Sequence, residues 1–211
     1  NAAYDVFIND DEFVLKYVNL GVTHSDYDYQ TNLFSYRIEY SVFHQMQGLI
    51  FNRSAVERYV SAEVKDYDMQ MRAVLGKIIV PGMTDQQKVK AVHDYMVVNY
   101  KYATDFKSGL YGNDTYAFHG LLKNGTGVCQ AYAEMFFLFM CYEDIECYYV
   151  TGWAKNETGE YGLHAWNVVY VEDGYYHVDV TFDDPVPDTS NKISYEYFLK
   201  TDEEMAKDHE W

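Results

Sequence analysis

One stretch of the chain is almost continuously apolar, and it predicts the centre of the fold. Residues 125–140 read GTGVCQAYAEMFFLFM, and after Cys129 only Gln130 and Glu134 interrupt the apolar side chains. A helix that is apolar on nearly every side lies in the middle of a domain. We therefore expect a glycine-containing loop that leads into a buried helix, with Cys129 in the first turn of that helix.

The residues before this stretch have the three- and four-residue spacing of amphipathic helices. Apolar side chains recur at such steps through residues 54–80, and the Pro-Gly pair at residues 81–82 ends the segment. Thr84 stands three residues before Gln87, and this capping-box pattern predicts the start of a second helix. His93 lies beside the apolar face of that helix, where we expect a packed core histidine.

After the cysteine stretch the apolar residues alternate with polar ones, which is the period of a β-strand. The alternation predicts strands over residues 146–153, 164–171 and 175–181, with a hairpin turn at Asp173-Gly174. A helix followed by an antiparallel meander indicates an α+β fold.

The first part of the chain predicts an extension to this fold. Residues 13–18 and 34–43 carry partial alternation and many aromatic side chains, so we expect short strands there, before the helix of residues 54–80. No proline- or serine-rich linker marks a boundary. We therefore divide the chain into an N-terminal extension over residues 1–83, packed on a core domain over residues 84–211.

Composition and charge exclude several classes of protein. The chain has 16 basic and 33 acidic residues and a net charge of −17, which argues against nucleic acid and against anionic membrane surfaces as partners. It has no run of about eighteen apolar residues, so we expect no membrane span. Neither a CxxC nor an HExxH motif occurs, and we expect neither a metal site nor a cofactor.

The three cysteines cannot all pair with one another. Cys129 and Cys141 are separated on one predicted helix by about 18 Å, which is too far for a disulfide. Cys141 and Cys147 can pair only if the turn between them permits it, and we favour free thiols. Cys129 is chemically distinct, because a helix N-terminus offers unpaired N–H groups and a positive dipole that favour the nucleophilic thiolate.

Two polar residues of the predicted hairpin are candidate partners for Cys129. His164 and Asp179 lie on the same face of the hairpin, but the predicted turn leaves them offset by about four residues, or about 13 Å. A different turn or a bulge would shorten that distance. The three residues would then form a Cys–His–Asp triad, in which His164 removes the thiol proton and Asp179 orients the imidazole. The backbone N–H groups of Cys129 and Gln130 would hold the oxyanion.

Three sequence blocks, in this order, resemble the bacterial transglutaminase-like superfamily. They read GVCQAYA, LHAWNVVYVEDGYYHVDVTFDDP and YFLKTDEEMAKDHEW, and TDQQKVKAVHDYMVVNYKY resembles the helix that precedes the family's core. The resemblance covers roughly residues 84–211. It implies a papain-like α+β core in which a central cysteine-bearing helix packs on an antiparallel β-sheet, with a mixed strand and helix extension before it.

The resemblance also implies roles for individual residues. Cys129 falls on the family's nucleophile, His164 on its histidine and Asp179 on its aspartate, and the family's strands bring the last two together. Phe182 stands where members often have tryptophan, which implies a change of packing next to Asp179. Tyr116, in the loop before the cysteine, is a candidate for a further oxyanion-stabilising side chain.

Three other side chains are candidates for a substrate groove, namely Trp166, Tyr161 and His177. For Trp166 and His177 we favour packing within the sheet as the alternative role. Tyr161 stands in a polar loop and is the best candidate for a residue that determines specificity. Asp183 and Asp184 predict a turn that ends the third strand of the meander.

The resemblance implies cysteine-dependent acyl transfer on amide bonds of proteins or peptides through a thioester intermediate. The reaction is that of a transglutaminase, a deamidase or a cysteine protease, and the residues do not separate the three. The alternative is a catalytically silent module that keeps the fold and binds a surface protein or a wall polymer. In either case we expect the chain to act at the cell surface or outside the cell, and its oligomeric state is left open.

Overall fold

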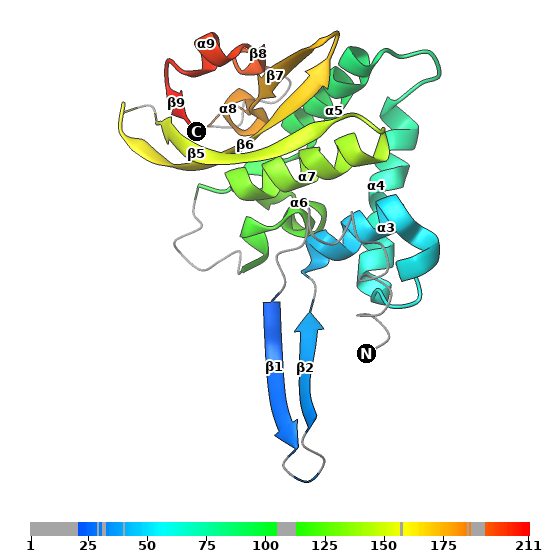
Figure 1. The fold of residues 1–211 in the computed structure, drawn as a ribbon. Helices are drawn as coiled ribbons and strands as arrows, with labels where there is room; N and C mark the ends of the chain where they lie inside the picture. Colours follow the sequence, from blue (N-terminus) through cyan, green and yellow to red (C-terminus); the bar gives the residue numbers. More distant parts are fainter. Residues whose placement is uncertain are drawn as a thin grey trace. The chain divides into compact units, whose positions relative to one another are not determined.

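The computed structural model describes residues 21–28, 30, 33–39, 41–104, 113–156, 158–184, 186 and 193–211. The described residues form two compact units, one within residues 1–68 and the other over residues 69–211 (Figure 1). This division falls inside one helix, and the boundary that the sequence predicted between residues 83 and 84 stays a prediction. The strand predicted at residues 13–18 lies outside the described residues.

The first unit contains a hairpin and a helix, and a second helix begins in it. These elements are β1 (Gly21–Asp28), β2 (Leu33–Glu39), α3 (Val42–Val56) and α4 (Ala62–Ile78), with β1 antiparallel to β2. The strand predicted at 34–43 is too long, because Ser41 caps α3 by accepting a hydrogen bond from the His44 backbone N–H at 3.3 Å. The single helix predicted over 54–80 is wrong in its first residues, since α4 begins only at Ala62. Ser61 precedes it, and the Ser61 hydroxyl accepts a hydrogen bond from the Val64 N–H at 3.2 Å.

In the second unit, α5 (Asp85–Asn99) begins where the sequence predicted. The Gln87 N–H donates to Thr84 Oγ1 at 3.3 Å, and the Thr84 N–H donates to Gln87 Oε1 at 3.0 Å, which completes the capping box. Gly82, in the turn before the helix, has a φ of 91°, a backbone geometry that glycine adopts without strain.

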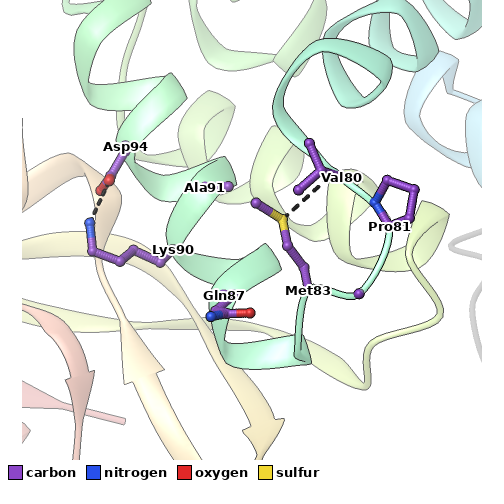
Figure 2. Close-up of a pocket in the computed structure, with 8 residues that line it drawn as sticks. Val80, Pro81, Met83, Gln87, Lys90, Ala91 and Asp94 are labelled. Carbon is purple, nitrogen blue, oxygen red and sulfur yellow. Dashed lines mark hydrogen bonds and ion pairs between the residues drawn. The ribbon is translucent and has the colours of Figure 1, made fainter.

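A hollow of about 460 Å³ lies at the surface where the turn after α4 meets the first turns of α5 (Figure 2). Val80, Met83 and Ala91 contribute apolar atoms to it, and Lys90 Nζ pairs with Asp94 Oδ2 at 2.5 Å in its wall. No cysteine or histidine is among the described residues that line this hollow. It therefore lacks the nucleophile and the base of the predicted triad.

A five-stranded antiparallel sheet forms the body of the second unit. Its strands, in spatial order, are β8 (Phe198–Lys200), β7 (Gly174–Val178), β6 (Tyr161–Val171), β5 (Cys147–Lys155) and β9 (His209–Glu210). Helix α7 (Cys129–Tyr142) lies along the curved sheet and contacts β5 and β6 (Figure 1). The predicted α+β class, with a cysteine-bearing helix packed on an antiparallel sheet, is confirmed.

Helix α7 is buried, as its apolar sequence predicted. Phe136, Leu138 and Phe139 have no exposed surface, and burial of each such side chain contributes roughly 1.5–3 kcal/mol. Asn167 of β6 is also buried, and its side-chain amide donates to the Ala133 carbonyl at 3.2 Å. Because nine of its fourteen residues are buried, the position of the helix, and with it that of its first residue, is fixed.

Short elements hold the loop that leads into α7. They are β3 (Lys101–Tyr102), η2 (Asn113–Tyr116), α6 (Phe118–Asn124) and β4 (Thr126–Gly127), and β3 pairs with β4 in parallel. Glu134 on α7 accepts a hydrogen bond from the Phe118 backbone N–H at 3.0 Å, which ties α6 to α7. The Val128 N–H donates to the Thr115 carbonyl at 3.0 Å and so fixes the residue before Cys129.

The turn between β6 and β7 differs from the predicted one by one residue. Val171 pairs with Gly174, so the two turn residues are Glu172 and Asp173 rather than Asp173 and Gly174. Their φ values of 50° and 69° lie in the left-handed region that two-residue hairpins of type I′ require. Aspartate tolerates this region better than most residues, which accounts for Asp173 at the second position of the turn.

The last helices of the unit are each one turn long, α8 (Val180–Asp183) and α9 (Asp202–Met205). Thr201 and Glu204 form a second capping box at the start of α9. Within the described parts of the chain, no helix has both the length and the apolar character needed to cross a membrane.

Gly152 of β5 lies against the strand β9. A Cβ atom added here would overlap the Glu210 backbone carbonyl and would come within 2.9 Å of Trp166 Cη2. We predict that Gly152→Ala lowers the free energy of unfolding by about 1–3 kcal/mol, because a backbone overlap is not relieved by a change of rotamer. Urea denaturation measures the change. Gly162→Ala in β6 is the matched control, since a Cβ there meets nothing within 4 Å, and equal stability of the two variants would contradict the pairing of β5 with β9.

Candidate active site

Cys129 is the first residue of α7 and is partly exposed. The N-cap residue is Val128, whose side chain has no hydrogen-bond acceptor and so makes no cap for the first turn. The N–H groups at this end of a buried helix are therefore not occupied by an N-cap side chain. They form the kind of site that stabilises a thiolate or an oxyanion.

His164 of β6 lies almost entirely inside the protein, with 7% of its side chain exposed. Its ring packs against Phe182 at 4.5 Å between centroids, and its Nε2 lies 2.6 Å from Asp179 Oδ2. Cys129 is close enough to the imidazole to contribute to its raised pKa. Since Nε2 is taken by Asp179, the nitrogen that remains for the thiol is Nδ1.

Asp179 is fully buried, and both of its carboxylate oxygens are hydrogen-bonded. It is the N-cap residue of α8, and Oδ1 accepts from the Thr181 N–H at 3.0 Å and from the Phe182 N–H at 3.2 Å. Oδ2 lies 2.6 Å from His164 Nε2 and 3.2 Å from His209 Nε2. An ionised carboxylate has about four acceptor positions, and all four are used here.

The observed register brings His164 and Asp179 together. Asn167 pairs with Val178, so Asp179, the next residue, is level with the position two residues from His164 on β6. The offset between His164 and Asp179 along the strands is therefore about 7 Å and not the predicted 13 Å. The third strand of the meander ends at Val178 and not at residue 181, because the chain turns into α8. That turn closes the remaining distance.

The two residues shift each other's titration. Burial alone would lower the pKa of His164, but the charge of Asp179 and the hydrogen bond to it, with a contribution from Cys129, raise it to about 10. Burial alone would raise the pKa of the Asp179 carboxyl, but His164 and His209 hold it well below its usual range. The pair therefore favours an imidazolium beside a carboxylate.

A cavity of about 750 Å³ opens beside His164. Its wall includes Tyr102, Lys155, Phe182 and Tyr197. Asp183, Asp184 and Asp208 line it as well, so acidic, basic and aromatic groups all border the cavity beside the imidazole.

Tyr102 is a site residue that the sequence analysis missed. It pairs with Gly127 in the short parallel bridge of β3 and β4, and the Ala103 N–H donates to the Gly127 carbonyl at 2.9 Å. Burial raises the pKa of Tyr102 to about 12, with contributions from the charges of Cys129 and Asp179, so the phenol stays protonated near neutral pH. Tyr102 reaches the site only because two strands of two residues each pair in the folded chain, and no local sequence pattern predicts that pairing.

Of the two predicted oxyanion residues, Gln130 directly follows the cysteine, but its side chain is engaged elsewhere. Gln130 is exposed, and its amide donates to Glu134 Oε1 at 3.1 Å within the same helix. Tyr116 is 45% exposed at the end of η2. It makes a smaller contribution to the raised pKa of Tyr102 than burial and Cys129 do. Their role with an oxyanion stays a prediction.

The predicted groove residues separate into buried and exposed groups. Trp166 and His177 are both 1% exposed, and the Trp166 indole N–H donates to His177 Nδ1 at 2.8 Å. Burial lowers the pKa of His177, whose Nε2 lies 3.0 Å from Asp202. Both side chains thus lie in the packing of the sheet. Tyr161 is exposed and stacks under the Lys155 ammonium at 5.1 Å, and its role in specificity stays a prediction.

Buried side chains anchor the helix that carries Asp179. His93 of α5 is fully buried, as predicted, and its Nε2 lies 3.1 Å from Asp183 Oδ2. Asp184 accepts from the Tyr132 hydroxyl at 2.6 Å. The turn predicted at Asp183 and Asp184 is instead the end of α8, because these buried bonds fold the segment inward.

His209 is a second residue that the sequence analysis missed, although it stands in the block that ends DHEW. His164, Asp179 and His209 each offer one atom that can bind a metal ion, and these atoms lie within 4.8 Å of one another. The hydrogen bonds of both histidines to one carboxylate oxygen account for this proximity. The prediction that the site needs no metal stays a prediction.

The chain resembles known proteins in family and in structure. The model of the transglutaminase-like superfamily matches residues 72–180. A candidate cysteine protease from Cytophaga hutchinsonii is 16% identical, with a TM-score of 0.43, and the match covers 60% of this chain and 44% of that one. A TGase is 15% identical, with a TM-score of 0.46, and the match covers 77% of this chain and 44% of that one. This chain therefore spans less than half the length of either structure, and no curated protein matches it.

We predict that the three cysteines react at different rates. Burial raises the pKa of Cys141 to about 12, and burial raises that of Cys147 well above its usual range, so both stay as unreactive thiols at neutral pH. Brief treatment with iodoacetamide at neutral pH should modify Cys129 at least about tenfold faster than either, as measured by peptide mapping. In urea all three should react alike. Equal rates in the folded protein would contradict the distinct environment of Cys129.

A second prediction concerns the dependence of stability on pH. The imidazole of His164 titrates near pH 6.5 when unfolded and near 10 when folded, so its stabilising contribution is complete below about pH 6.5 and is lost as the pH rises toward 10. The free energy of unfolding should therefore fall over this interval more steeply in the wild type than in His164→Gln. Urea titrations at several pH values measure both slopes, and parallel slopes would show that the ion pair is absent.

Proposed function

This chain belongs to the transglutaminase-like superfamily, and on that premise we propose that it transfers acyl groups from amide bonds of proteins or peptides through a thioester on Cys129. The observation that carries the proposal is the 2.6 Å bond between His164 and Asp179, on an imidazole whose other nitrogen is left for the thiol. A histidine held in this way has one orientation and one free nitrogen.

In the first half of the reaction the thiol proton is held on His164 Nδ1, as part of the imidazolium that Asp179 favours, and Cys129 Sγ attacks the carbonyl carbon of the amide. The N–H groups at the start of α7 bind the oxyanion that forms. The imidazolium then gives its proton to the leaving nitrogen, the C–N bond breaks, and a thioester and a free amine or ammonia result.

In the second half an incoming nucleophile attacks the thioester, and His164 accepts its proton. Water as the nucleophile gives hydrolysis, and an amine gives a new amide bond. Asp179 stabilises the imidazolium in both halves, which is consistent with the raised pKa of His164. The acidic and aromatic groups near the cavity suit a peptide substrate, and we place that substrate at the cell surface or outside the cell.

The alternative function is a catalytically silent binding module for a surface protein or a wall polymer. Binding alone does not require a buried carboxylate that is hydrogen-bonded to an imidazole near a thiol. The described contacts therefore favour the enzyme.

We predict that a glutamine-containing peptide library, incubated with the protein with and without an added amine, yields products that depend on Cys129. Incorporated amine identifies a transglutaminase, conversion of glutamine to glutamate a deamidase, and shorter peptides a protease, all read by mass spectrometry. Cys129→Ala should lower the rate by at least about a thousandfold. Cys141→Ala is the matched control and should keep the wild-type rate. Activity that survives in Cys129→Ala would overturn the mechanism.

A further inference from the structure

We propose that His209, on strand β9, is a positioning residue of the active site, which fixes the Asp179 carboxylate and through it the imidazole of His164. The inference rests on the proposed function, since it assigns the second partner of the same carboxylate. It also makes a strand from the end of the sheet a part of the catalytic apparatus.

Two imidazoles converge on one oxygen atom of Asp179. His209 Nε2 lies 3.2 Å from Oδ2, the oxygen that also binds His164 Nε2 at 2.6 Å, and the two ring centroids are 5.6 Å apart. The other oxygen is held by the N-terminal N–H groups of α8. The carboxylate therefore cannot rotate about its χ2 angle without breaking bonds to both histidines and to α8.

The surroundings of His209 hold its ring rigidly in place. β9 pairs with β5, where Ala154 is opposite His209, and the side chain has no exposed surface. The ring packs edge-on against Trp166 and at a tilt against Phe182, with 5.0 Å between ring centroids in each pair. The ring is therefore set by the sheet before any substrate is bound.

A further carboxylate holds the far side of the His209 ring. Nδ1 lies 2.7 Å from Asp208 Oδ1, and Asp208 Oδ2 accepts from the Tyr197 hydroxyl at 2.8 Å. A neutral imidazole has one N–H, so it donates to one of the two carboxylates, and it donates to both only as the imidazolium. The positioning role depends on the bond from Nε2 to Asp179.

This arrangement predicts which kinetic constant depends on His209. The side chain of His209 has no exposed surface, so it does not contact a substrate bound in the cavity. Its loss should let the Asp179 carboxylate shift and should misalign the imidazole with Cys129. Misalignment of this kind reduces the rate of the chemical step and leaves binding nearly unchanged.

Two polar variants of the full chain test the role of the Nε2 bond. The amide of His209→Gln reaches the position of Nε2, whereas that of His209→Asn reaches only the position of Nδ1 and leaves Asp179 without its second histidine bond. We expect His209→Asn to lower both kcat and the rate of Cys129 alkylation by about tenfold to a hundredfold, with KM nearly unchanged. His209→Gln should recover most of both rates.

The matched control is His119→Gln, because His119 is a partly buried histidine that pairs with Asp114 and does not bond to Asp179. It should keep the wild-type rates. Alkylation of Cys129 needs no substrate, so it tests the positioning role even if the peptide library yields no product and the proposed function fails. Unfolding midpoints confirm that each compared variant is folded.

Two results would overturn the proposal. One is a folded His209→Asn variant whose kcat and alkylation rate equal those of the wild type. The other is a wild-type enzyme that loses its rate in a chelator and regains it with Zn²⁺, because His209 would then serve as a metal ligand and not as a hydrogen-bond donor.

Discussion

The buried carboxylate of Asp179 is the group on which the site depends. A charge removed from water is tolerated only if hydrogen bonds and opposite charge replace the solvent, and Asp179 obtains these from α8, His164 and His209. A buried acceptor that loses its donor costs about 1–3 kcal/mol. The folded state therefore stabilises the same arrangement that the chemistry requires, and stability and function are not opposed at this residue.

The carboxylate keeps its place because the single turn that follows it is held from two directions. His93 of α5 binds Asp183, 90 residues away in the chain, and Tyr132 of α7 binds Asp184, 52 residues away. A helix of four residues has little stability of its own, since nucleation costs more than so few bonds return. Buried side chains from two long helices thus supply the order that the local sequence lacks.

Elements of this fold that depend on local patterns are predictable from the sequence, and contacts between distant segments are not. The apolar run after Cys129 and the alternation around His164 predicted the helix and the sheet, because burial acts on each residue in turn. The register of β6 with β7 depends on which two turn residues have left-handed conformations. The Asp-Gly pair predicted a turn one residue later than the observed one. Tyr102 and His209 reach the site through strands of two residues, which are too short to have a period of their own.

Strand β9 also bears on how the protein is made. His209 follows Cys129 by about 80 residues, and it enters the sheet beside β5 after the rest of the hairpin has already been synthesised. In a nascent chain the cysteine helix is therefore present for some time before His209 holds the carboxylate that orients His164. The imidazole therefore lacks this second support of its carboxylate until residue 209 has been synthesised and β9 has paired with β5.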